Sequence, residues 1–209
     1  AARLEYTIGC LRLAAQIGAP TITAMPGGRF PPLEPDPRRV PDDPTREQAW
    51  TWFLQGLREA LPVAKEVGVT LLVEPEPGCL VESINDFENF WSRLNPSERA
   101  LVGMNYDVGH VVCAGDDPAD GVARSREWIR HVHLEDIAGR VHDHLICGHG
   151  EIDFPRVFRA LEAIDYAGFV TIELYPYVDR PVVAGTESLR HLREVLRLDD
   201  PSSRPPSGP

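Results

Sequence analysis

The stretch Val69-Thr-Leu-Leu-Val-Glu74 decides the fold, because an unbroken apolar run of strand length ends on a carboxylate. A second stretch repeats the pattern. Val102-Gly-Met-Asn-Tyr-Asp107 is largely apolar and again ends on an acid, with His110 three residues further on. Near-continuous apolar strands are typical of parallel sheets that are buried on both faces. The sequence therefore predicts buried parallel strands whose last residues carry polar chemistry.

Helical and strand patterns alternate along the rest of the chain. We expect helices at 2–17, at 48–67, from an N-cap at Ser83 to Leu94, from Asp117-Pro118 to Trp128, at 155–164 after a cap at Asp153, and from a cap at Thr186 to about Leu196. We expect strands at 21–25, 69–73, 101–106, 129–134 and 169–174. This alternation predicts right-handed crossovers and a parallel sheet, either doubly wound and open or a (β/α)₈ barrel. Neither a G-x-G-x-x-G after the first strand nor a Walker A motif is present, so nothing supports nucleotide binding.

Composition narrows the class of partner. The 209 residues include 21 Lys+Arg and 32 Asp+Glu, a net charge of −11, and Lys65 is the single lysine. Nucleic acid is disfavoured, because its phosphates must be met by clustered cations. No apolar run reaches the length of a membrane-spanning helix, and the N-terminus has no signal-peptide pattern. The four separated cysteines favour a reducing compartment, so we expect a cytoplasmic protein.

Proline marks two segments apart from this alternation. Seven of the 20 prolines fall between Pro26 and Pro44, which predicts a long surface loop. Four more fall in the last nine residues, so we expect 199–209 to be a disordered Pro/Ser-rich tail. Residues 1–198 are then expected to form one domain.

Residues that bind metals or move protons lie at the ends of four of the expected strands. They are Glu74, Asp107, His133 and Glu173. Parallel strands place such residues on one rim of the sheet, and this mixture of oxygen and nitrogen donors suits a divalent ion. One carboxylate after a strand is commonly a helix cap or an ion-pair partner. Four at equivalent positions favour a metal site, because a cation relieves the mutual repulsion of the acids.

These residues also carry a resemblance to a known family. The motifs are Glu74-Pro-Glu-Pro-Gly, Asn105-Tyr-Asp107-Val-Gly-His110, His131-Val-His133-Leu-Glu-Asp136 and Thr171-Ile-Glu173. They resemble the metal-site motifs of the xylose-isomerase-like TIM-barrel superfamily, which holds sugar phosphate isomerases and epimerases, inosose dehydratases and the more distant endonuclease IV enzymes. The resemblance covers about residues 3–196. It implies a (β/α)₈ barrel of which this chain holds strands four to eight, without the first three βα units.

The resemblance also implies roles for individual residues. Glu74, Asp107, His133 and Glu173 would hold one divalent ion, with Mn²⁺ expected and Mg²⁺, Co²⁺ or Zn²⁺ as alternatives. Glu74 and Glu173 would also act as the acid/base pair. His110 would contact a substrate hydroxyl or bind a second metal. Arg140 is a further candidate substrate contact, with an exposed ion pair as the alternative, and Asp136 would contact either the substrate or a metal ligand. His131 and His133 share a strand face under strict alternation, so only the His-x-x-Asp pattern selects His133.

The segment from Arg140 to Phe154 resembles the family's loop that ends in Gly-x-Gly-x-Ile-Asp-Phe. Within it, His144 is a candidate for a second metal site together with His110. A polar loop whose histidines face solvent or substrate is the alternative, and this is our interpretation of His142 and His149.

The leading functional prediction is a metal-dependent isomerase or epimerase acting on a sugar or related polyhydroxylated carbonyl compound through an enediolate. An inosose-type dehydratase begins with the same abstraction of an α-proton. Phosphodiester hydrolysis of the endonuclease IV kind is favoured by His110 and His144 and opposed by the net charge. A non-catalytic family member is the fourth possibility. We also expect a homo-oligomer, because an open five-stranded sheet leaves strand edges unpaired.

Overall fold

The computed structural model describes residues 2–24, 26 and 45–197. The helices of this part are α1 (Ala2–Ile17), α2 (Arg46–Val67), α3 (Ile84–Ser92), α4 (Pro96–Arg99), α5 (Val108–Ala114), α6 (Pro118–Ser125), α7 (Phe154–Ala163) and α8 (Pro181–Val195). The strands are β1 (Thr21–Ala24), β2 (Thr70–Val73), β3 (Val102–Asp107), β4 (Ile129–Leu134) and β5 (Val170–Ile172). Most of the Pro26–Pro44 segment and the 199–209 tail lie outside the described residues, so both predictions remain predictions. No helix in the described ranges combines the length and the apolar character needed to cross a membrane.

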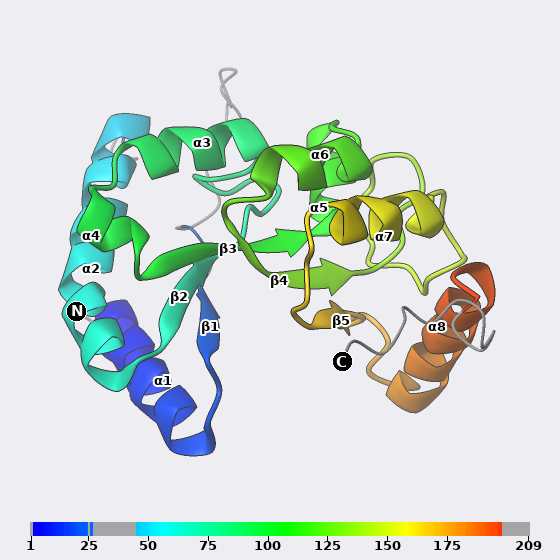
Figure 1. The fold of residues 1–209 in the computed structure, drawn as a ribbon, viewed down its shortest axis with the longest axis horizontal. Coiled ribbons are helices and arrows are strands. Elements are labelled where there is room, and N and C mark those ends of the chain that lie inside the picture. Colours follow the sequence, from blue (N-terminus) through cyan, green and yellow to red (C-terminus); the bar gives the residue numbers. More distant parts are fainter. Residues whose placement is uncertain (1, 25, 27–44, 198–209) are drawn as a thin grey trace, which may run out of the picture. The chain divides into compact units, whose positions relative to one another are not determined.

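The five strands form one sheet in the order β1-β2-β3-β4-β5 (Figure 1). The pairings of β1 with β2, β2 with β3, and β4 with β5 are all parallel. Each crossover between neighbouring strands contains at least one helix, as parallel pairing requires. The predicted fold class, five βα units of a TIM-barrel type, is confirmed.

Most predicted elements are confirmed within two residues, and two helix caps are confirmed in atomic detail. Ser83 accepts a hydrogen bond from the Asp86 N–H and forms a capping box with it, while Asp153 caps α7. The predicted cap at Thr186 is wrong. The last helix begins at Pro181, whose fixed φ suits a first helical position, and Thr186 lies inside it. The helix predicted to reach Trp128 ends at Ser125, and the short helices α4 and α5 were not predicted.

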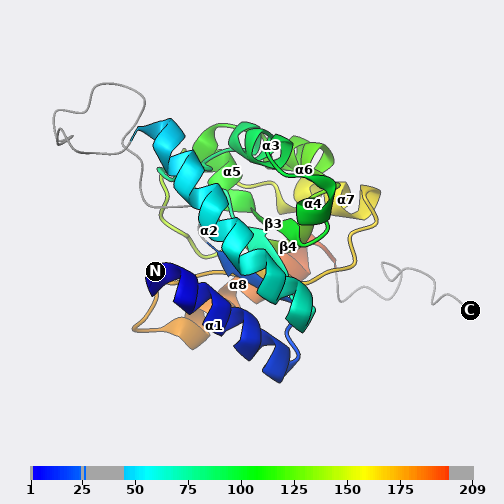
Figure 2. The same cartoon turned by 90° about the vertical axis from the view of Figure 1, so that its left-hand side faces the viewer.

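Tertiary contacts divide the chain into two compact units. Among the described residues, the first comprises 2–24, 26, 45–106 and 128–131. In it, α1 and α2 pack against each other (Figures 1 and 2). The buried face of α2 carries Trp50, Leu54, Leu57 and Leu61, spaced as the amphipathic pattern of the sequence predicts. Every residue of β3 is buried, as expected for a strand in the middle of a sheet.

Among the described residues, the second unit comprises 107–127 and 132–197. In it, α6 packs against α7, and α7 also contacts α8. Val122 of α6, Val157 and Leu161 of α7 and Leu192 of α8 are buried. The long connection from β4 to α7 also belongs to this unit, and its Ile137 and Ile146 side chains are buried. The second unit thus contains the ends of β3, β4 and β5, where three of the candidate ligands lie.

Candidate metal centre

Three of the four predicted ligands come together in the second unit. His133 Nδ1 lies 3.9 Å from Asp107 Oδ2 and 3.6 Å from Glu173 Oε2. Asp107, His133 and Glu173 each offer one ligand atom, and these atoms lie within 4.8 Å of one another. The three residues come from the ends of β3, β4 and β5, as the alternation of strands and helices predicts. His133, not His131, supplies the imidazole of this group.

The two carboxylate oxygens of Asp107 lie in different surroundings. Asp107 is the N-cap of α5, and its Oδ1 accepts a hydrogen bond of 2.8 Å from the His110 backbone N–H. Its Oδ2 is buried and has no hydrogen-bond partner among the described residues. A buried carboxylate oxygen without a donor is costly, and a bound cation would remove that cost. The donor set and this oxygen therefore fit a divalent ion.

The charge states of these carboxylates also suit a cation. Burial alone would raise the pKa of Asp107, but His110, the adjoining Glu135 carboxyl group and the His110 backbone N–H outweigh it, and the pKa lies below its usual value. Contact with the His133 imidazole lowers the pKa of Glu173 and outweighs its partial burial. Both groups are therefore carboxylates at neutral pH, which is the form that binds metal ions.

Glu74, the fourth predicted ligand, belongs to the first unit. Glu74 directly follows β2 and is 8% exposed. Its Oε1 accepts a hydrogen bond of 2.9 Å from Asn105 Nδ2. β2 pairs in parallel with β3, the strand that ends on Asp107. By topology, Glu74 therefore follows the strand adjacent to the one that carries Asp107.

Three histidines of the second unit form a further cluster. His142 Nε2 lies 2.9 Å from His110 Nε2 and 2.7 Å from His144 Nε2. A neutral imidazole nitrogen carries either one proton or one lone pair, so His142 Nε2 cannot make a full hydrogen bond to both neighbours. Three imidazole nitrogens that meet in this way fit an electrophile such as a metal ion. His142, which we interpreted from the sequence as facing solvent or substrate, is a member of this cluster.

Burial keeps two of these imidazoles neutral. Desolvation lowers the pKa of His142 to about 4, helped by the neighbouring His110 and His144. Desolvation also lowers the pKa of His144, against the opposing effect of Asp107 and Glu173. The His144 ring also contacts the ring of Tyr175, with 4.4 Å between ring centroids and 57° between the ring planes. At neutral pH, His142 and His144 are therefore uncharged, the form in which an imidazole coordinates a metal.

The remaining predicted site residues occupy different surroundings. Asp136 is 1% exposed, and its carboxylate accepts hydrogen bonds from backbone N–H groups rather than pointing to open solvent. Arg140 is exposed, with its guanidinium against Gly115 at the end of α5. His149 is exposed as well. Of the three predicted substrate contacts, His110 alone lies within the histidine cluster.

Glu135 is a buried carboxylic acid that the sequence analysis did not single out. It is fully buried, and together with Asp107 and His110 it forms a third group of possible ligands. Gly109 packs so closely on it that any side chain at that position would overlap the Glu135 carboxyl group. In the sequence, Glu135 lies between the buried end of β4 and Asp136, where an exposed acid is not expected. This position was the available signal.

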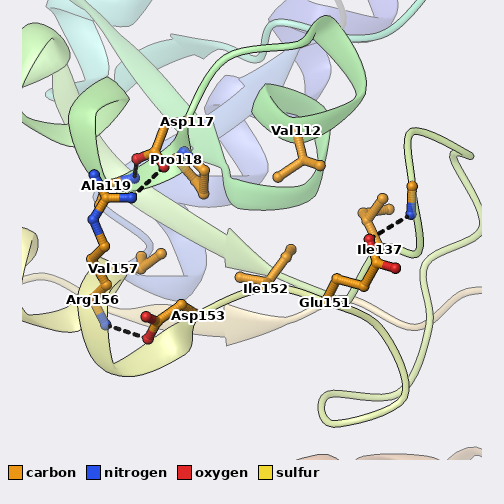
Figure 3. Close-up of a pocket in the computed structure, with 11 residues that line it drawn as sticks. Val112, Asp117, Pro118, Ala119, Ile137, Glu151, Ile152, Asp153, Arg156 and Val157 are labelled. Carbon is orange, nitrogen blue, oxygen red and sulfur yellow. Dashed lines mark hydrogen bonds and ion pairs between the residues drawn. The ribbon is translucent and has the colours of Figure 1, made fainter.

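A separate cavity of about 220 Å³ lies between the starts of α6 and α7. Figure 3 shows Ile137 and Ile152 lining it, with Arg156 directed toward Asp117 and Glu151 at the other side. Arg156 also forms an ion pair of 2.8 Å with Asp120. This cavity shares no lining residue with the groups of possible ligands.

Comparison with known proteins places this geometry in a family. Residues 1–197 match the family described as xylose isomerase-like TIM barrel. The chain is 28% identical over 162 residues to an inosose dehydratase of Geobacillus kaustophilus (strain HTA426). The aligned region covers 66% of this chain and 51% of that enzyme. The chain thus spans about half the length of the curated relative.

Solved structures agree on the fold. A 3-keto-D-glucoside 4-epimerase from E. coli superposes with a TM-score of 0.76 at 24% identity, covering 91% of this chain and 70% of that one. An IolI protein with a bound zinc atom superposes with a TM-score of 0.70 at 19% identity, covering 94% of this chain and 70% of that one. The family match spans almost the whole chain, and the resemblance first noted in the strand-end motifs is confirmed: this chain belongs to the xylose isomerase-like TIM barrel family.

Proposed function

We propose that this chain carries the centre of a metal-dependent isomerase or epimerase of a sugar or related polyhydroxylated carbonyl compound. The observation that carries the proposal is the convergence of Asp107, His133 and Glu173, with ligand atoms within 4.8 Å of one another. We propose Glu74 as the fourth ligand, because it follows the strand paired with β3 and matches the family motif.

The proposed chemistry is the transfer of a proton next to a carbonyl group. A divalent ion held by these residues would polarise the substrate carbonyl and stabilise an enediolate. Glu173 takes the proton from the substrate carbon, the C–H electron pair forms the new carbon–carbon double bond, and the π pair of the carbonyl moves onto its oxygen. Glu74 returns a proton to carbon from the other face. Contact with His133 lowers the pKa of Glu173, so the group is ionised at neutral pH and is in the form that can accept a proton.

Dehydration of an inosose is the second candidate. The similarity to inosose dehydratases favours it, and its first step is the same proton abstraction. The reaction then continues by loss of a hydroxyl group from the neighbouring carbon as water, instead of by return of the proton. The two candidates therefore share the base and differ in the product.

The histidine cluster favours one further proposal, a second ion held by His110, His142 and His144. Hydrolysis of a phosphodiester commonly uses two or more ions, and this cluster is the reason to keep it as a third candidate. The net charge of −11 opposes it for a nucleic-acid substrate.

One experiment separates these candidates. The intact protein is loaded with Mn²⁺ and incubated in D₂O with a ketose, with an inosose and with a phosphodiester, and the products are identified by mass spectrometry and NMR. An isomer that carries deuterium on carbon supports the isomerase or epimerase. A product that has lost one water supports the dehydratase. Cleavage of the phosphodiester supports hydrolysis, and no turnover of any substrate contradicts all three proposals.

Metal analysis of the same protein tests the number of ions. One ion per chain, lost in Asp107→Asn, supports the single centre. Two ions per chain, of which His142→Ala removes one, support the second site.

A cytoplasmic location remains a prediction, and it agrees with the finding that none of the four cysteines is in a disulfide.

A further inference from the structure

Asp136 holds together three separate parts of the connection between β4 and α7. Its Oδ1 accepts hydrogen bonds from the backbone N–H of Ile137 at 3.0 Å and of Ile152 at 3.1 Å. Its Oδ2 accepts one from the N–H of Gly148 at 2.8 Å. Two of these donors are the first and last residues of the segment 137–152, and Gly148 lies inside it. We call this segment the histidine loop because it carries His142 and His144. One buried carboxylate therefore fixes the path of sixteen residues.

The backbone of Asp136 adds a fourth tie at the middle of the loop. Asp136 and Leu145 form an antiparallel bridge, with both N–H···O hydrogen bonds at 2.8 Å. Leu145 directly follows His144, whose φ of 46° lies in the left-handed region. A residue with a Cβ adopts that region only where its surroundings over-determine it. The bridge to Asp136 supplies that constraint one residue away.

The glycine pattern of the loop fits the same carboxylate. A Cβ at Gly150 would overlap Asp136 Oδ1, so the loop can close over the carboxylate only with glycine at this position. Ile137 and Ile152, which donate to Oδ1, also line the cavity of Figure 3, so the carboxylate shapes that wall as well. The motif from Gly148 to Asp153 is thus matched to a buried acid twelve or more residues earlier.

We propose that Asp136 is a positioning residue, and that it aims the imidazoles of His142 and His144 at His110 by fixing the histidine loop. This proposal deepens the proposed function. It rests on that function only for the role of the histidine cluster, which is proposed to bind an ion. The Asp136 carboxylate accepts its hydrogen bonds from backbone N–H groups of the histidine loop. It acts through the backbone ties on both sides of the two histidines.

The test reads the imidazoles directly, in the intact protein without metal or substrate. In Asp136→Asn, an amide replaces the carboxylate and cannot accept all three N–H groups. We expect the ¹⁵N and ¹H signals of the His142 and His144 rings to shift, while those of His131 in the first unit do not. We also expect hydrogen exchange at the amides of Gly148 and Ile152 to accelerate about tenfold or more, as expected on losing a hydrogen bond to a charged group.

Asp153→Asn is the matched control, because Asp153 caps α7 just after the histidine loop by accepting from the Arg156 N–H at 3.0 Å. This variant should leave the His142 and His144 signals unchanged. Unchanged signals in Asp136→Asn despite faster exchange, or equal shifts in both variants, would overturn the proposal.

A second variant covers the case in which Asp136→Asn does not fold. Gly150→Ala keeps the carboxylate but forces it and the loop apart, so the same ring signals should shift. If neither variant folds, the unmodified protein decides. Protected amides at Gly148 and Ile152 support the proposal, and exchange as fast as in an exposed loop contradicts it. None of these readings depends on activity, so failure of the proposed function would leave them interpretable.

Discussion

At the scale of single residues, the carboxylate after a strand shows why sequence reasoning reached the site. Each such acid could be a helix cap or a metal ligand, and Asp107 shows that the two roles are compatible. One oxygen caps α5, and the other remains available for a cation. The family pattern His-x-x-Asp was needed to choose His133 over His131. Asp107 and Glu173 were indicated because the ends of parallel strands lie on one rim. That rule needs no knowledge of side-chain conformation.

His142 and Glu135 could not be identified in the same way. The direction of His142 depends on the path of the histidine loop, and that path depends on hydrogen bonds to a buried aspartate. The spacing His142-x-His144 was the available signal, but in a loop it does not determine direction. Burial of Glu135 likewise follows from packing against Gly109, which local sequence does not reveal.

The role of Glu173 as a base gives the first prediction. Glu173→Gln in the intact protein should reduce turnover by about 10²–10⁴-fold, because a positioned base is lost and a ligand is weakened. Steady-state kinetics on the preferred substrate measures the loss. Glu162→Gln is the matched control on the exposed side of α7, and Cys79→Ala should also retain activity. A Glu173→Gln variant with most of its activity would rule out the two-carboxylate scheme.

At the scale of elements, long periodic segments were predicted well and short ones were not. The helices α1, α2 and α7 have an apolar face or a cap that the sequence displays, and their bounds are confirmed within two residues. The helices α4 and α5 have four and seven residues, too few for a helical period to be recognised. The start of α8 was predicted wrongly because Thr186 was preferred to Pro181, although proline is common at a first helical position.

The contact between α2 and α4 gives a prediction with a pH dependence. Glu98 Oε1 lies 2.7 Å from Arg58 Nε, and Oε2 accepts from the Asn95 N–H at 2.9 Å. The hydrogen bond from Arg58 lowers the pKa of Glu98 below the usual value of 4.5 for a glutamate. A depressed carboxyl pKa stabilises the folded state above the unfolded pKa, and the contribution is lost as the pH falls through the folded pKa. Glu98→Gln should therefore reduce the free energy of unfolding at neutral pH by about 1 kcal/mol.

Urea unfolding at neutral pH and at a pH well below 4.5 measures this difference. It should shrink at the lower pH, where Glu98 is protonated in the original protein as well. Glu66→Gln, an exposed change near the end of α2, is the control and should have little effect. A difference that does not depend on pH would assign the loss to packing and not to the charge of Glu98.

Close packing at the start of α5 gives a third prediction. In Gly109→Ala, the new methyl group would overlap the buried Glu135 carboxyl group, so the free energy of unfolding should fall by about 1–3 kcal/mol. Gly185→Ala is the matched control, because nothing lies within 4 Å of a Cβ built at that helical position. It should leave stability unchanged or raise it by up to about 1 kcal/mol. Equal effects of the two changes on thermal unfolding would contradict the close approach of Gly109 to Glu135.

At the scale of the whole molecule, the five strands of the described residues and their parallel pairing were predicted correctly from alternation alone. The choice between an open sheet and a barrel was not, because both have the same local pattern, and the family motifs decided it. The match over residues 1–197 now confirms that choice. The chemistry of the protein is proposed from the candidate metal centre and not from the fold, because one fold hosts many reactions.

Self-association is a prediction at this scale. Large apolar side chains are exposed in each unit, with Tyr6 and Ile17 of α1 at 76% and 71% and Phe169 and Val182 at 79% each. Their burial against another chain would be favourable by about 25 cal/mol per Å². We expect the intact protein to be a homo-oligomer, as measured by light scattering during size-exclusion chromatography. A monomer at all concentrations tested would contradict this expectation.

The central claim is that Asp107, His133, Glu173 and Glu74 hold one divalent ion. Anomalous diffraction from crystals of the intact protein grown with Mn²⁺ tests it most directly. We predict an anomalous peak with Asp107, His133 and Glu173 at about 2.0–2.2 Å, the range for oxygen and nitrogen ligands, and with a Glu74 oxygen completing the set. An ion bound elsewhere, or one at this position with Glu74 beyond bonding distance, would contradict the account.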